Sequence, residues 1–124
     1  MKLKSSRMYS PQLLDHFQSP RNAGDLSDAD ATVEKENPVC GDVIRLSLKV
    51  QGERINEIRF KAKGCVPSMA CGSALTELVL GKTIAEARKL SPAQVRQSVG
   101  GLPPASNHAA ELAVEALLAA LKKL

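Results

Sequence analysis

Aromatic residues are scarce in this chain: they make up 2% of its 124 residues, and none is tryptophan. The core must therefore be built from leucine, valine, isoleucine and alanine, and few rings are present on which nucleic-acid bases could stack. The chain has no apolar run of the ~18 residues that a membrane-spanning helix needs, and no apolar signal core follows its basic first residues. These absences predict a cytoplasmic protein without a membrane partner.

A concentrated basic patch and a disulfide framework are also missing. The 17 basic and 13 acidic residues give a net charge of +4, and the two signs are interspersed along the chain. This pattern favours a solvated surface of mixed charge, so we expect no nucleic-acid partner. The three cysteines are an odd number, and nothing marks the chain as secreted. Free thiols are therefore expected in place of disulfides.

The hydrophobic pattern indicates one helix, then strands, then further helices. Apolar and polar residues alternate along two segments that flank the turn Gln51-Gly52, which is typical of an antiparallel hairpin. We predict strands over residues 31–35, 43–50 and 54–62, and helices over 11–18, 67–80, 83–89, 92–99 and 106–123. This order predicts an α+β fold in which a small antiparallel sheet of about three strands packs against helices on one face. The length favours a single domain, 1–124, with residues 1–8 as a flexible N-terminus.

Two cysteines lie in short turns at the two ends of the predicted hairpin. The turns are Pro38-Val39-Cys40-Gly41-Asp42 and Lys63-Gly64-Cys65-Val66-Pro67. The hairpin should bring both ends to the same edge of the sheet, which makes Cys40 and Cys65 neighbours in space. A third turn, residues 102–108, opens the last helix and carries His108.

Two thiols, a carboxylate and an imidazole from three loops have the chemistry of a soft-metal site. Cys65 precedes a helix N-terminus, whose partial positive charge is expected to lower the thiol pKa. Asp42 offers a hard, exchangeable oxygen ligand. Each residue taken alone also has a structural interpretation: a cysteine packed in a turn, a strand-end cap for Asp42, and an exposed helix residue for His108. The spacing contains no Cys-x2-Cys pair that would decide between these interpretations.

The same residues lie within a resemblance that covers the chain from Tyr9 to its end. The chain resembles the IscU/SufU/NifU-N iron–sulfur cluster assembly scaffolds. The matching segments are Tyr9-Ser10, Leu14-Asp15-His16-Phe17, Ser19-Pro20-Arg21-Asn22-Ala23-Gly24, Cys40-Gly41-Asp42, Phe60-Lys61-Ala62-Lys63-Gly64-Cys65, Thr76-Glu77, Gly81-Lys82 and Leu102-Pro103-Pro104 with His108 after it.

The resemblance implies a SufE/NifU-like fold and a non-enzymatic scaffold or carrier. Such proteins receive persulfide sulfur from a cysteine desulfurase, bind iron, assemble a [2Fe–2S] cluster and release it to acceptor proteins. Carried over residue by residue, the resemblance makes Cys40, Asp42, Cys65 and His108 the ligands of the iron or transient cluster, and it allows Zn²⁺ in the resting form. His16 belongs to the family's N-terminal helix pattern and is expected to pack or to face a partner.

The chain departs from the family at its third cysteine and its chaperone-recognition turn, it lacks the SufU-type insertion between the second and third site regions, and it gains a thiol elsewhere. The family's third cysteine directly follows the histidine, and Ala109 stands there in this chain. The chaperone-recognition turn of the IscU branch continues Val-Lys, whereas this chain has Ala105-Ser106, so we do not expect dependence on an Hsp70-type chaperone. Cys71 lies in the helix after Cys65, either as an additional ligand that replaces the missing thiol or as a buried packing residue.

Three hypotheses follow for the function. The first is a scaffold for iron–sulfur cluster assembly with ligands Cys40, Asp42, Cys65 and His108. The second is a zinc-bound persulfide sulfurtransferase or relay that uses the same residues. The third is a degenerate homologue that only binds partners, for which the alanine at position 109 is the main argument.

Overall fold

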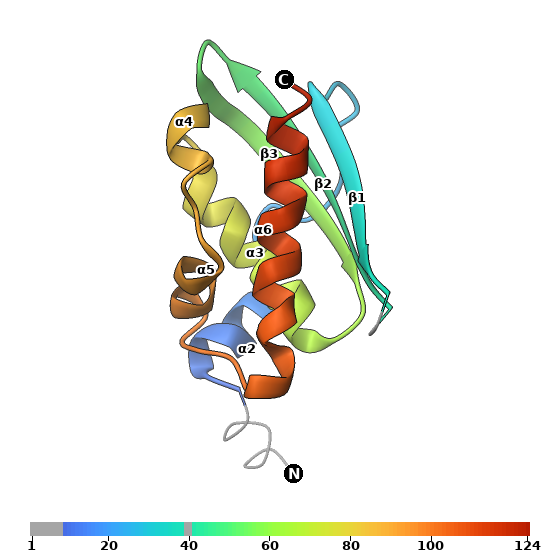
Figure 1. The fold of residues 1–124 in the computed structure, drawn as a ribbon, viewed down its shortest axis with the longest axis vertical. Helices are drawn as coiled ribbons and strands as arrows, with labels where there is room; N and C mark the ends of the chain where they lie inside the picture. The colour runs from blue at the N-terminus through green and yellow to red at the C-terminus, as the bar shows by residue number, and fades with distance from the viewer. Residues whose placement is uncertain (1–8, 39–40) are drawn as a thin grey trace.

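The computed structural model describes residues 9–38 and 41–124, so the segment expected to be a flexible N-terminus lies outside the described residues. A short helix precedes the strands, and the other helices follow them (Figure 1). The elements are α2 (Pro11–Gln18), β1 (Ala31–Asn37), β2 (Asp42–Gln51), β3 (Arg54–Lys63), α3 (Val66–Val79), α4 (Ile84–Ala87), α5 (Pro92–Ser98), the 3₁₀ turn η1 (Pro104–Ser106) and α6 (Asn107–Leu121). None of these described helices is long and apolar enough to cross a membrane.

The strands form one antiparallel sheet in the order β1-β2-β3. Val33 pairs with Leu46, and Leu46 pairs with Phe60, so one buried residue from each strand lies in the same row. Because successive side chains of a strand point to opposite faces, this row and its neighbours give the sheet an apolar face. The predicted α+β fold with a small three-stranded antiparallel sheet is confirmed.

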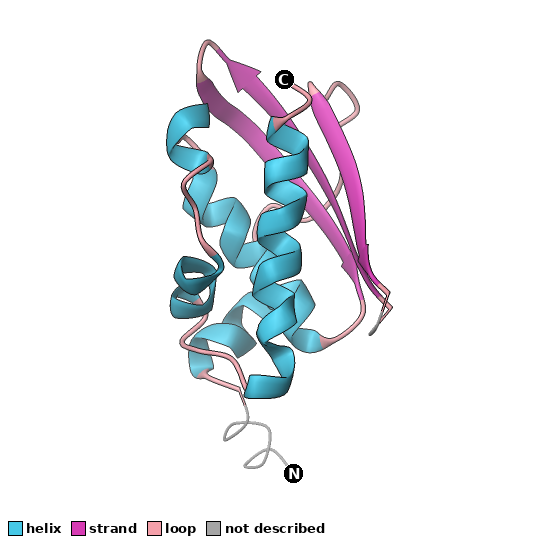
Figure 2. Cartoon of the chain, viewed as in Figure 1, coloured by secondary structure: helices cyan, strands magenta, loops and turns pink. Residues whose placement is uncertain are grey.

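The helices cover that apolar face of the sheet (Figure 2). Helix α3 lies at the centre of this layer and contacts α2, α5, α6 and the sheet, so most of its residues are buried. At Gly72 a Cβ atom would lie 2.6 Å from Cδ2 of Phe60, so the glycine lets α3 approach β3 closely. Helix α3 therefore has a fixed position relative to the hairpin, and its N-terminus lies where β3 ends.

The opposite face of the sheet carries charged side chains that pair with the loop before β1. Asp25 lies 3.3 Å from Nε of Arg45 and 3.2 Å from Nζ of Lys61, and Asp28 lies 2.5 Å from Nζ of Lys49. Exposed pairs of this kind add little stability. Arg45, Lys49 and Lys61 on this face of the sheet are each paired with an aspartate.

Local signals place each helix start to within one residue, and three predicted starts are corrected by the structure; in α4 the helix begins at Ile84 because Thr83 is its N-cap. Ser10 caps α2 by accepting the Leu13 N–H at 2.9 Å, as its Ser-Pro motif indicates. Helix α3 begins at Val66, not at Pro67, because Cys65 is its N-cap and proline is tolerated within the first turn. The last helix begins at Asn107 because residues 104–106 form the separate 3₁₀ turn η1.

Candidate metal centre

The hairpin brings Asp42 and Cys65 together. Asp42 is the first residue of β2, and Val43 pairs with Lys63 at the end of β3. Gly64 and Cys65 follow directly and lead into α3. The distance between Cys65 Sγ and Asp42 Oδ2 is 3.3 Å, although 23 positions separate the two residues in the sequence. The predicted meeting of the hairpin ends is therefore observed for these two residues.

His108 reaches the same place from the other end of the chain. It is the second residue of α6, and η1 directs the chain into that helix. Its Nε2 atom lies 3.2 Å from Asp42 Oδ2. Within the described part of the chain, a carboxylate oxygen of Asp42, the sulfur of Cys65 and an imidazole nitrogen of His108 all lie within 4.8 Å of one another.

Asp42 is the hydrogen-bonding centre of this group. Its side chain is buried, and Oδ2 accepts from the Ser68 hydroxyl at 2.7 Å in addition to its contacts with Cys65 and His108. Oδ1 accepts the backbone N–H of Cys65 at 3.2 Å. Burial raises the pKa of Asp42, but the bonds from Ser68, Cys65 and His108 together outweigh it, so this pKa lies below its ordinary value. Asp42 is therefore held as a carboxylate.

Gly64 leaves room for that carboxylate. Its φ of +139° lies in a region that L side chains rarely adopt, and a Cβ at this position would lie 2.0 Å from Asp42 Oδ1. Any side chain at position 64 would collide with the Asp42 carboxylate and would also strain the backbone, so glycine is required there for both reasons.

The expectation of a lowered pKa for the Cys65 thiol is wrong. Burial raises this pKa, the bonds with Ser68 lower it, and the neighbouring Asp42 raises it further, with a net result above the ordinary value. The helix N-terminus is present as predicted, but desolvation and a nearby carboxylate oppose the thiolate more strongly. A cation bound at this site would supply the charge that favours the thiolate.

Cys71 lies away from this group, in the hydrophobic core. Its side chain is fully buried on α3, and burial raises its thiol pKa to about 12. This placement matches the packing interpretation of Cys71, and the thiol is not a member of the group formed by Asp42, Cys65 and His108. Ala109, at the position of the missing thiol, is also buried. Cys40 is the remaining predicted ligand, and it lies outside the described residues.

Ser68 was not predicted as part of the site. Ser68 is the third residue of α3 and lies three positions after Cys65, the N-cap of that helix. Residues at this spacing share a helix face, and the Ser68 hydroxyl lies 3.3 Å from the Cys65 sulfur. A polar residue three positions after a helix-capping cysteine is the signal that would have found it.

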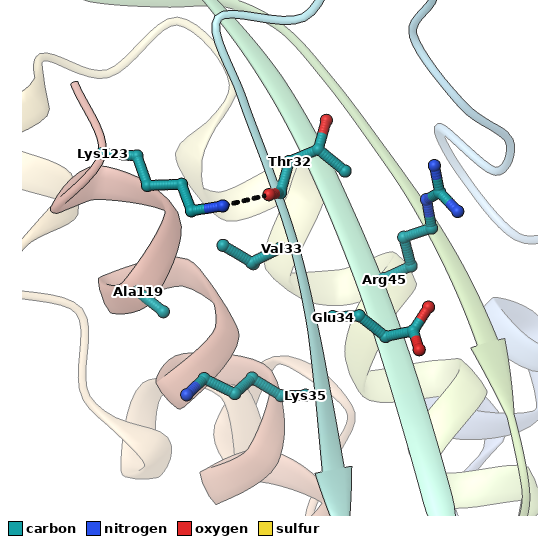
Figure 3. Close-up of a pocket in the computed structure, with 7 residues that line it drawn as sticks. All are labelled: Thr32, Val33, Glu34, Lys35, Arg45, Ala119 and Lys123. Atoms are coloured by element: carbon teal, nitrogen blue, oxygen red, sulfur yellow. Dashed lines mark hydrogen bonds between the residues drawn. The ribbon is translucent and has the colours of Figure 1, made fainter.

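A pocket of about 200 Å³ opens beside His108. It is lined by Glu36, Asn37, Pro38, His108, Glu111, Leu112 and Glu115. A larger hollow of about 400 Å³ follows the edge of β1, where the Lys123 ammonium donates to the Thr32 carbonyl (Figure 3). That hollow contains neither a thiol nor an imidazole. Of the three donors, His108 lines the smaller pocket.

One sulfur, one oxygen and one nitrogen donor meet at one point, a combination that suits Zn²⁺ and iron. The ionised carboxylate can only accept, so the hydrogens on the Cys65 sulfur and on His108 Nε2 must both leave these atoms when the two atoms bind a metal. The three donors come from β2, the β3–α3 junction and α6, which the core holds in fixed positions.

Comparison with known proteins assigns the chain to a family. Residues 8–124 match the family described as NifU-like N terminal domain. The iron-sulfur cluster assembly scaffold protein IscU 1 of Archaeoglobus fulgidus is 44% identical over 114 residues, which cover 92% of this chain and 74% of the relative. The scaffold protein IscU of Aquifex aeolicus is 41% identical over 116 residues, with the same coverage of 92% and 74%.

A solved structure has the same fold at low identity. The N-terminal part of a nitrogen-fixing NifU-like protein from Brucella abortus superimposes with a TM-score of 0.78 at 18% identity, over 96% of this chain and 95% of that one. The predicted resemblance is confirmed: the chain belongs to the family of NifU-like N-terminal domains.

Proposed function

We propose that this chain is a non-enzymatic scaffold that assembles an iron–sulfur cluster, holds it transiently and passes it on. The observation that carries the proposal is the convergence of a thiol, a carboxylate and an imidazole within 4.8 Å of one another. The names of the relatives from Archaeoglobus fulgidus and Aquifex aeolicus, both iron-sulfur cluster assembly scaffold proteins, support it.

The proposed ligands are Cys40, Asp42, Cys65 and His108. Thiolates suit the task because they bind iron and can carry persulfide sulfur. The Asp42 carboxylate is a harder and weaker donor for such a cluster, which makes it the ligand that allows release. His108 supplies the fourth position. Cys71 is left out of the ligand set, because its side chain belongs to the core.

The supply of sulfur and the delivery of the cluster need partners. A cysteine desulfurase would provide persulfide sulfur, and iron–sulfur acceptor proteins would take the cluster. Cys65 is partly exposed, and His108 lines the pocket beside the site, so a partner's sulfur can approach from solvent. The proposal treats residues 1–124 as one working domain in the cytoplasm, where thiols stay reduced, and it does not require an Hsp70-type chaperone.

Anaerobic reconstitution tests the scaffold proposal. Metal-free protein is incubated with ferrous iron, cysteine, a cysteine desulfurase and a dithiol that reduces persulfide sulfur to sulfide, and then iron, acid-labile sulfide and the visible spectrum are measured. We expect about two irons and two sulfides per site, with thiolate-to-iron charge-transfer bands. Cys40→Ser and Cys65→Ser should lose most of both, whereas Cys71→Ser should retain them. Equal iron and sulfide contents in the parent, Cys40→Ser and Cys65→Ser would contradict the proposal.

A zinc-bound sulfur relay is the second candidate, and the sulfur, oxygen and nitrogen donors that converge at the site favour it. Two sulfurs, one oxygen and one nitrogen would make a tetrahedral Zn²⁺ site, with one thiol passing persulfide to an acceptor. Faster desulfurase turnover without cluster build-up would support the relay over the scaffold. A homologue that only binds partners would contain no metal even when it is produced anaerobically.

A further inference from the structure

Ser68 is a buried hydroxyl inside the site that the proposed ligand set does not use. Its residue is 4% exposed, and it lies in the first turn of α3, three positions after Cys65. The hydroxyl donates to Asp42 Oδ2 at 2.7 Å, the shortest of the contacts that this oxygen makes. A buried hydroxyl aimed at a proposed ligand acts on how that ligand is held.

The contacts of Asp42 divide into two kinds. Cys65 and His108 contact Oδ2 through the sulfur and the nitrogen that are proposed to bind metal. When these two atoms bind the metal, they no longer donate to the carboxylate. The Ser68 hydroxyl and the Cys65 backbone N–H remain, one on each carboxylate oxygen.

The geometry points to Ser68 as the positioning residue for Asp42 in the metal-bound site, an inference that rests on the proposed function. A carboxylate oxygen has two lone pairs, so Oδ2 can accept from Ser68 with one and bind a metal with the other. The Cys65 N–H fixes Oδ1 at the same time, and the two bonds together set the rotation of the carboxylate. The Ser68 hydroxyl contacts Asp42 and the Cys65 sulfur, but it is not itself a proposed metal ligand. Its effect on metal binding therefore passes through the orientation of Asp42.

The first test is metal affinity, measured without any cluster-assembly reaction. Metal-free protein is titrated anaerobically with Co²⁺, followed by its visible absorption, and with Zn²⁺ in competition with a chelator. Ser68→Ala should bind both metals about 10- to 100-fold more weakly, the range typical when a residue that supports a ligand is removed. The ligand-field bands of bound Co²⁺ should also shift, since their energies report the ligand set and its geometry.

Ser68→Thr and Ser68→Val form a matched pair, since threonine and valine share one shape and differ by a hydroxyl in place of a methyl. Threonine should restore affinity to within about threefold of the parent and valine should not, because only threonine can donate to Asp42. Ser73→Ala removes another buried serine of α3 that does not contact Asp42, and it should leave affinity and spectrum unchanged. Equal binding by the threonine and valine variants would overturn the inference. Urea unfolding of each metal-free variant shows whether it is folded.

A double-mutant cycle separates positioning from direct ligation. In an Asp42→Ala background, Ser68→Ala should cause no further loss of Co²⁺ affinity, because the group through which it acts is absent. A further loss as large as in the parent would mean that Ser68 acts through its contact with the Cys65 sulfur or as a ligand itself, and not through Asp42, and the inference would fail. If the parent binds neither metal, the proposed function fails before any variant is compared. If the parent binds and Ser68→Ala binds equally well, only the role of Ser68 fails.

Discussion

Helix α3 contributes one buried serine to each of two polar clusters. The site cluster lies at its N-terminus and consists of Asp42, Cys65, Ser68 and His108. The α2–α3 cluster lies further along and consists of His16, Arg21, Ser73 and Glu77. Each cluster contains one of the chain's two histidines.

The two clusters satisfy their polar groups in different ways. In the α2–α3 cluster, Ser73 Oγ accepts the Arg21 backbone N–H at 2.9 Å and lies 2.7 Å from His16 Nδ1. The serine therefore links α3 both to α2, which contains His16, and to the loop after α2, which contains Arg21. In the site cluster, a thiol, a hydroxyl and an imidazole all face one carboxylate oxygen. A buried serine is common to both, so burial does not identify the functional cluster. The presence of a thiol and a carboxylate among the converging groups does.

The largest difference is expected between the two described cysteines. Cys65→Ser should weaken Zn²⁺ binding by more than about 100-fold, beyond the effect of losing a residue that only supports a ligand. Cys71→Ser should leave binding intact and should lower the free energy of unfolding by about 1–3 kcal/mol, since it places a hydroxyl in the apolar core. Chelator competition measures the first change and urea unfolding the second. Retained binding by Cys65→Ser would contradict the assignment of the site cluster.

A pair of glycines sharpens the contrast between the site and the rest of the fold. Gly64→Ala would place a Cβ 2.0 Å from Asp42 Oδ1 at a φ of +139°, so it should lose metal binding and about 3 kcal/mol or more of stability. Gly52→Ala lies in the β2–β3 turn at a φ of +64° with nothing within 4 Å of the new Cβ. It should cost about 1–2 kcal/mol, the strain of the left-handed region alone.

The same two measurements, chelator competition and urea unfolding, are made on both glycine variants. Gly52→Ala should keep the metal affinity of the parent. If Gly64→Ala bound metal as tightly as Gly52→Ala, the placement of Asp42 against Gly64 would not matter for binding, and the geometry described for the site would be wrong.

The α2–α3 cluster should respond in the opposite way. Ser73→Ala leaves the Arg21 N–H and His16 Nδ1 without their partner. It should lower the free energy of unfolding by about 1–3 kcal/mol, the cost of an unsatisfied buried polar group. Metal affinity should stay within about twofold, because the two clusters share no hydrogen bond. A loss of affinity as large as that of Ser68→Ala would show that the clusters are coupled through α3.

The sequence predicted the parts of the site that depend on local pattern. The alternation in β2 and β3 defined a hairpin whose two ends meet, which predicted that Cys40 and Cys65 are neighbours. Cys40 lies outside the described residues, and Asp42 from the same turn is the residue found beside Cys65. The turn before α6 placed His108 near a helix start, where it is found. The predicted type of sheet was also correct. Strand β1 extends to Asn37 and not only to residue 35, because its pairing with β2 continues to Asp42.

What the sequence did not predict depends on how segments pack in three dimensions. The helix N-terminus beside Cys65 was visible, but the burial that raises its pKa is set by segments that meet only in the fold. The burial of Cys71 and the contact of Ser68 with Asp42 depend on how α3 packs against the sheet and α6, which the local pattern of α3 does not specify.

The smallest expected effect is the pH dependence of the α2–α3 cluster. Burial, and then the neighbouring Arg21, lower the pKa of His16 below its ordinary value of 6.5. Between the two pKa values the unfolded chain binds more protons than the folded one, so this contribution to stability is complete above about pH 6.5 and is lost as the pH falls below it. His16→Asn cannot titrate, so the difference in unfolding free energy between parent and variant should shrink between pH 7.5 and 5.5, as measured in urea on metal-free protein. A constant or growing difference would show that His16 is not held neutral, and burial would then not outweigh its contact with Glu77.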